Sequence, residues 1–196
     1  MAEPVGHRAR HERAASGARP PRWTFPLFTA RLRVSVGLGA WVVAAVGVGV
    51  WDPPSVVPWL PLLILGGMVA STLVHEGAHA LAAHNLGYRV EWVVLGGLAG
   101  LTAYFGRDDR PLDRAAVALA GPAASALLVL LLVGLRATLA PMSSTTDLVE
   151  LAIAVNALAL VGNLLPLRGS DGAHLVRSLA EHRRLRSRAA PDRGPA

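Results

Sequence analysis

The chain has 196 residues, of which 53% are hydrophobic and 16% are charged. Both fractions depart from those of an ordinary water-soluble domain in the direction of a membrane protein, and the length favours one domain. The formal net charge is +6 and cysteine is absent, which excludes disulfides and thiolate metal sites, so any metal ligand must be His, Asp or Glu.

Residues 1–31 are rich in Arg, Pro and Ala without apolar periodicity, which predicts a disordered tail. Four apolar segments follow: Val34–Trp51, Val56–Ala83, Ala115–Leu135 and Leu148–Leu167. Each meets or nearly meets the length of a membrane span, about 20 mostly apolar residues. Buried helices of a soluble α-protein are the alternative, but a chain of this length has too little polar surface to cover four apolar helices. The sequence therefore predicts an all-α membrane protein with about four transmembrane helices, as a domain at 32–180 followed by a basic cytoplasmic tail at 181–196.

The placement of arginine predicts the topology. All 19 basic residues are Arg, and all but Arg136 lie near the N-terminus, between the second and third spans, or after the fourth span. Positive charge stays on the cytoplasmic side, so both termini are expected to be cytoplasmic. A basic chain can also bind nucleic acid. Here the charges surround apolar segments, so we expect a lipid bilayer as the partner and no binding of nucleic acid. The Ala, Arg and Gly bias suggests a bacterial-type cell membrane.

The segment Gly87–Phe105, between the second and third spans, has a different character. Tyr88–Leu95 is rich in β-branched and aromatic residues, and Gly96, Gly97 and Gly100 then interrupt it. This pattern predicts a short β-hairpin or a re-entrant segment on the cytoplasmic side.

The second span contains the motif His75-Glu76-Gly77-Ala78-His79. Residues four apart share one helix face, so the two imidazoles can bind one Zn²⁺ together. Glu76 can then reach a water molecule at the metal and take its proton. Ionisable groups inside a span are rare and mark function, although a polar cluster that only packs helices is the alternative. The motif indicates a zinc hydrolase with Glu76 as the base.

A catalytic zinc needs a third protein ligand. Asp171 follows the fourth span, which is expected to end on the same cytoplasmic side as His75 and His79. The residue could equally cap a helix that runs through Arg188, and the pattern alone leaves both roles open. His174 is a weaker candidate for a ligand, and a solvated interfacial position explains it better.

Two asparagines lie inside the fourth span. Asn163 could donate a hydrogen bond to a substrate carbonyl or to the oxyanion that develops from it. An interhelical hydrogen bond explains Asn163 equally well. Packing is the better explanation for Asn156.

The chain resembles the site-2 protease family of intramembrane zinc metalloproteases over roughly residues 56–175. Three motifs carry the resemblance: His75-Glu76-Gly77-Ala78-His79, Ala120-Gly121-Pro122, and Asn163-Leu164-Leu165-Pro166 followed by Asp171-Gly172. The resemblance implies that His75, His79 and Asp171 hold zinc and that Glu76 is the base. It also implies hydrolysis of peptide bonds in or near transmembrane segments of membrane-protein substrates, as in regulated intramembrane proteolysis.

The chain departs from the family pattern in three places. Ser170 precedes Asp171 where the family usually has Leu, and Arg168-Gly169 replaces a Pro-rich spacing. Ser125 stands where Asn commonly follows Ala-Gly-Pro. None of these residues is an implied ligand, so the departures concern substrate fit and the approach to Asp171. The tails are too short for a PDZ or CBS domain, so a short form of the family is expected.

The substrate is expected to unwind locally and to pair as a strand with Val90–Leu95. Two other functions compete with proteolysis. A non-cleaving scaffold or regulator of the same fold would have no use for the intact Glu76. A transporter could use intramembrane His and Glu as a cation path, but the sequence has one clustered site and no inverted repeat.

Overall fold

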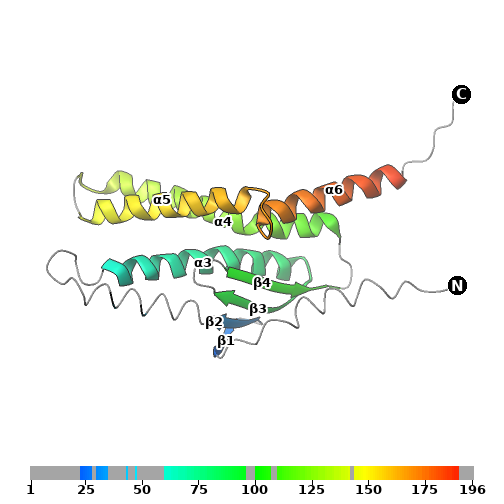
Figure 1. Ribbon diagram of the computed structural model, residues 1–196, viewed down its shortest axis with the longest axis horizontal. Helices are drawn as coiled ribbons and strands as arrows, with labels where there is room; N and C mark the ends of the chain where they lie inside the picture. The colour runs from blue at the N-terminus through cyan, green and yellow to red at the C-terminus, as the bar shows by residue number, and fades with distance from the viewer. Residues whose placement is uncertain are drawn as a thin grey trace, which may run out of the picture.

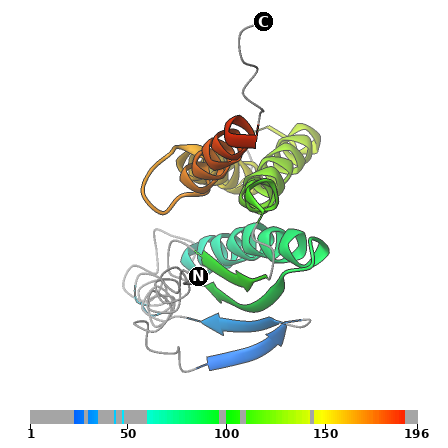
Figure 2. The same cartoon turned by 90° about the vertical axis from the view of Figure 1, so that its right-hand side faces the viewer.

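The computed structural model describes residues 23–27, 30–34, 43, 47, 60–95, 100–106, 110–141 and 144–189. The elements in these ranges are β1 (Trp23–Leu27), β2 (Ala30–Val34), α3 (Leu60–Asn85), β3 (Arg89–Leu95), β4 (Gly100–Phe105), α4 (Pro111–Thr138), α5 (Ser144–Leu164) and α6 (Asp171–Ala189). Figures 1 and 2 show that α3 lies between the sheet and a layer formed by α4, α5 and α6.

Three helices in the described part of the chain are long and apolar enough to cross a membrane, at Pro61–Asn85, Pro111–Thr138 and Thr145–Leu164. They correspond to the predicted second, third and fourth spans and confirm a mostly helical membrane protein. Helix α4 is rich in exposed leucines, with Leu130 and Leu131 at 67% and 63% exposure. The predicted first span, Val34–Trp51, lies almost entirely outside the described residues.

The predicted hairpin is present as β3 and β4, which pair antiparallel from Leu95 opposite Gly100 to Arg89 opposite Phe105. It belongs to a larger sheet of order β1-β2-β3-β4, in which β2 pairs parallel with β3. The strands β1 and β2 reach into the segment 1–31 that was predicted as a disordered tail, so residues 23–27 and 30–31 have regular structure. Residues 1–22 lie outside the described part.

The end of α3 directs the chain into β3 through a Schellman turn. Gly87 has φ 83°, which suits a residue without a β carbon. The Tyr88 N–H donates to the Ala83 carbonyl at 2.9 Å, and the Gly87 N–H donates to the His84 carbonyl at 3.0 Å. Tyr88 and Ala83 then pack with Val90 and Val117 in a buried cluster. This cluster fastens the C-terminal half of α3 to β3 and α4, and so fixes the helix face that carries His75 and His79.

The connection from α5 to α6 is equally defined. Pro166 follows the last residues of α5, and Gly169 has φ 93°. The Ser170 N–H donates to the Leu167 carbonyl at 3.0 Å, and α6 begins at the next residue. The helix continues to Ala189, so the predicted boundary at residue 180 falls inside a helix. This turn brings the start of α6 back toward α3.

Candidate metal centre

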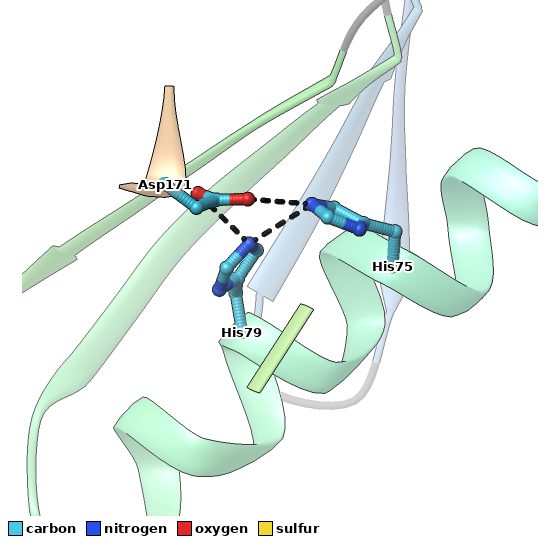
Figure 3. A group of neighbouring side chains, drawn as sticks. All are labelled: His75, His79 and Asp171. Atoms are coloured by element: carbon cyan, nitrogen blue, oxygen red, sulfur yellow. Dashed lines mark hydrogen bonds and ion pairs between the residues drawn. The ribbon is translucent and has the colours of Figure 1, made fainter. Parts of the chain in front are cut away.

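Three side chains from two distant segments converge on one point. His75 and His79 lie one turn apart on α3, and Asp171 is the first residue of α6. The Nε2 atom of His75 lies 3.0 Å from Asp171 Oδ2, and the Nε2 atom of His79 lies 3.3 Å from Oδ1. The two Nε2 atoms are 3.1 Å apart. Figure 3 shows both rings and the carboxylate pointing toward one another.

These separations suit a tetrahedral zinc. Bonds of about 2.0–2.1 Å from zinc to nitrogen and oxygen place tetrahedral ligand atoms roughly 3.3 Å apart. Two imidazoles and one carboxylate are also a donor set that catalytic zinc uses with a fourth, open position. All three residues offer their ligand atoms within 4.8 Å of one another, and both histidines are buried. The residues therefore fit the metal that the sequence motif indicates.

The residue before Asp171 takes the capping role that the sequence left open for Asp171. The Ser170 Oγ atom accepts a hydrogen bond from the Ala173 N–H at 3.2 Å, as an N-cap does. A β carbon on Gly172 would collide with the Leu164 carbonyl, so Gly172 allows the start of α6 to pack closely on the end of α5. Both contacts leave the Asp171 carboxylate free to face the histidines.

The charge state of Asp171 is compatible with metal binding. Burial raises the pKa of its carboxyl, but hydrogen bonds and charge from His75 and His79 outweigh burial and bring the pKa well below its usual range. Asp171 is therefore a carboxylate at neutral pH. His174, the weaker candidate, is exposed and is not one of the three residues that converge.

Helix α4 supports both imidazoles without providing a ligand. His79 Nδ1 donates to the Val117 carbonyl at 2.7 Å, and His75 Nδ1 lies 2.8 Å from Ser125 Oγ. Gly121 lies between these residues on the same face of α4, and a β carbon there would meet the Nε2 atoms of both rings. The Ala-Gly-Pro motif thus provides the space in which the two histidines approach α4.

Replacing Gly121 by Ala should therefore disrupt the centre. The added β carbon would push both rings away from Asp171, and overpacking of this kind costs about 1–3 kcal/mol. We expect a lower thermal midpoint and much weaker zinc binding. Gly134→Ala on the same helix is the matched control, because nothing lies within 4 Å of a β carbon there. Equal zinc binding by both variants would contradict the close approach at Gly121.

Glu76 is buried and has its own support from the sheet. The Thr102 hydroxyl on β4 donates to Glu76 Oε2 at 2.7 Å and lies 3.2 Å from the Glu76 carbonyl oxygen. A β carbon on Gly100 would collide with the Glu76 carboxylate, so β4 passes close to it because Gly100 has no side chain. The hairpin therefore fixes the carboxylate beside the two histidines. Sequence reasoning assigned no role to Thr102.

A cavity of about 340 Å³ opens onto His75, Asp171 and Glu76. Asn163 and Asn156 of α5 also line it, so both asparagines lie on the cavity side of the helix. Asn156 donates to the Ala152 carbonyl of its own helix at 2.8 Å. A second hollow of about 410 Å³, mainly apolar, lies between α3, α4 and α5. The two hollows share Ser71, Thr72, Asn156 and Ala159 at their border.

Comparisons with known proteins find a matching family and similar sequences. The profile of the Peptidase M50B-like family matches residues 38–168. Rip3 of Mycobacterium tuberculosis, a candidate zinc metalloprotease, is 40% identical over 131 residues, which are 64% of this chain and 33% of Rip3. The candidate zinc metalloprotease sll0528 of Synechocystis is 34% identical over 125 residues, 62% of this chain and 32% of that protein. The chain thus spans about a third of the length of the curated relatives it matches.

The fold resembles that of a solved protease. The site-2 protease from Methanocaldococcus jannaschii superimposes with a TM-score of 0.63 over 82% of this chain and 73% of that chain. The two sequences are 16% identical, so this likeness concerns the fold.

Proposed function

The chain belongs to the Peptidase M50B-like family, and from this premise we propose that it is an intramembrane zinc metalloprotease of the site-2 type. Family membership supports a membrane zinc metalloprotease. The proposal adds that the enzyme hydrolyses peptide bonds in or near transmembrane segments of membrane proteins, as in regulated intramembrane proteolysis. The observation that carries it is the convergence of His75, His79 and Asp171 beside the buried Glu76, next to a cavity that His75, Glu76 and Asp171 line.

In the proposed mechanism His75, His79 and Asp171 hold Zn²⁺, and Glu76 is the general base. Zinc would polarise the scissile carbonyl and lower the pKa of a water molecule toward about 7. The Glu76 carboxylate accepts a proton from water while the oxygen atom of that water molecule bonds to the carbonyl carbon of the substrate. Glu76 then delivers that proton to the amine nitrogen as the C–N bond breaks. Thr102 holds the carboxylate in place by donating to Oε2.

Asn163 is proposed to bind the carbonyl oxygen of the substrate. Its side chain lines the same cavity as Glu76 and Asp171, from the α5 side. An amide N–H directed at this oxygen stabilises the negative charge that develops there. The carboxylate and the amide would then act from α3 and α5 on the two sides of the bound peptide.

The edge of the sheet that is available to a peptide differs from the one expected from the sequence. The strand Val90–Leu95 was expected to pair with substrate, but β3 already has β2 on one side and β4 on the other. Among the described strands, β4 pairs only with β3, and it carries Gly100 and Thr102 beside Glu76. We therefore place the extended peptide along the outer edge of β4, where backbone hydrogen bonds would align it.

The apolar hollow supports a transmembrane substrate. It is bounded by α3, α4 and α5 within their membrane-spanning lengths, and it adjoins the catalytic cavity at Ser71 and Asn156. An apolar segment entering from the bilayer would meet matching apolar walls before it reaches the polar residues. The arginine distribution supports a multi-pass orientation in which both termini are cytoplasmic, with the catalytic centre in the cytoplasmic half of α3.

Proteoliposomes that contain the purified chain and a labelled single-span reporter test the proposal. We expect cleavage of a reporter whose span contains a Gly-Asn or Pro-Gly break, because such a helix unwinds easily. We expect slower cleavage of a uniform Leu span, and no cleavage after zinc is removed by a chelator. Zinc binding without cleavage of any membrane reporter would favour a scaffold of the same fold. Zinc flux into the vesicles would favour a transporter.

A further inference from the structure

The hydrogen bonds on the far side of the two imidazoles come from one face of α4. Val117, Gly121 and Ser125 follow one another at intervals of four residues, so they form a stripe along that face. Val117 and Ser125 each lie at hydrogen-bonding distance from an Nδ1 atom, while Gly121 leaves space at the Nε2 atoms. Both histidines are therefore held at Nδ1 and face Asp171 with Nε2.

The Val117 carbonyl and the Ser125 hydroxyl differ in the position of the imidazole proton that they allow. A carbonyl oxygen only accepts, so Val117 fixes the proton of His79 on Nδ1 and leaves a lone pair on Nε2. A hydroxyl both donates and accepts, so Ser125 is compatible with a proton on either nitrogen of His75. Of the two imidazoles, only His75 depends on a side chain for the orientation and protonation that a metal ligand needs.

We propose that Ser125 is a positioning residue that holds His75 with its proton on Nδ1 and its Nε2 lone pair directed at the metal. The inference rests on the zinc centre of the proposed function and adds a residue that provides no ligand atom. Hydrogen bonds to the second nitrogen of a ligand histidine fix its tautomer and orientation and raise its basicity. Ser125 is buried, at 9% exposure, and lies on the wall of the cavity that His75 also lines.

Substitutions at Ser125 can keep or remove its hydrogen bond to His75. The short Ser125 side chain reaches His75 directly at 2.8 Å. Its oxygen is attached to the β carbon, so Thr keeps the hydrogen bond whereas Ala removes it. The comparison of Ala with Thr at this position therefore separates the hydrogen bond from the volume of the side chain.

The test measures zinc affinity of the detergent-purified full chain by competition with a chelator. Ser125→Ala is expected to bind zinc about 10–100-fold more weakly than wild type, as loss of such a partner typically does. Ser125→Thr should bind close to wild type. The matched control is Ser178→Ala, because Ser178 is also a buried helical serine, at 6% exposure, outside the centre. Its zinc affinity should not change.

A second readout reports the imidazole directly. In protein labelled with ¹⁵N-histidine, the His75 signals, assigned through a His75→Gln variant, should show a protonated Nδ1 in zinc-loaded wild type. Ser125→Ala should show a shifted or exchange-broadened Nδ1 signal, and Ser125→Thr should restore it. A role in packing alone would not move this signal.

The outcomes separate this inference from the proposed function. Wild-type zinc affinity and an unchanged His75 signal in Ser125→Ala would overturn the role of Ser125 and leave the metal centre intact. Equal loss in Ser125→Thr would also overturn it, because the effect would then follow from packing. Absence of zinc from the wild type would overturn the proposed function and this inference together.

Discussion

Replacement of Glu76 by Gln is expected to abolish peptide hydrolysis while about one zinc per chain remains bound. Gln has nearly the same shape, and its amide can still accept a hydrogen bond from Thr102, so the centre should stay folded. The amide cannot take a proton from water, and loss of a general base typically slows a reaction by about 10²–10⁴-fold. The measurement is the single-turnover rate on the membrane reporter, with metal content determined on the same sample.

The control for this variant is Glu91→Gln on β3. Glu91 is exposed and lies on the hairpin that supports Glu76, but it does not line the cavity. It should cleave the reporter at the wild-type rate. Thr102→Val should give an intermediate rate with unchanged zinc, because the carboxylate remains but loses the hydroxyl that fixes it. Retention of full activity by Glu76→Gln would remove Glu76 from the role of base.

The parts of the centre that sequence could predict are those set by local geometry. His75 and His79 share a face because any α-helix places residues four apart in line, so the motif already implied a pair of ligands. The three apolar helices could also be predicted from the sequence, because the length and composition of a segment determine whether it can span a membrane. Asp171 depended on the resemblance, since composition and spacing alone gave capping and ligation equal weight.

The partners of the ligands could not be read from the sequence, because they depend on how helices and strands pack. The contact between His75 and Ser125 requires the register of α3 against α4, and that between Glu76 and Thr102 requires the register of β4 against α3. The cap of α6 could have been found. Serine is as good an N-cap as aspartate, and the helix starts one residue earlier than the capping alternative assumed.

The sheet was the least predictable element. The parallel pairing of β2 with β3 joins Arg31 to Trp92, two residues far apart in the chain, so no local pattern reports it. That pairing occupies the side of β3 which the predicted strand addition needed. The hairpin was predicted because its two strands are adjacent in sequence, whereas the identity of the free edge depended on the complete strand order.

Replacement of Asp171 by Ala is expected to remove zinc from the purified protein or to weaken its binding strongly. The carboxylate lies 3.0 Å and 3.3 Å from the two Nε2 atoms and is the one acidic ligand candidate in the cluster. Without it, two imidazoles remain, and catalytic zinc sites need three protein ligands. Zinc that binds only the folded state stabilises it, so the zinc-dependent rise in the thermal midpoint should also disappear.

Two neighbouring variants make this result specific to ligation. His174→Ala changes an exposed residue of the same helix and should keep zinc at the wild-type level. Ser170→Ala removes the N-cap and should lower stability by about 0.5–2 kcal/mol, with most of the zinc retained. If Asp171→Ala instead retained stoichiometric zinc and His174→Ala lost it, the third ligand would be His174. The convergence of the three side chains at the start of α6 argues against that result, because only Asp171 faces both imidazoles from the turn that Gly169 and Gly172 allow.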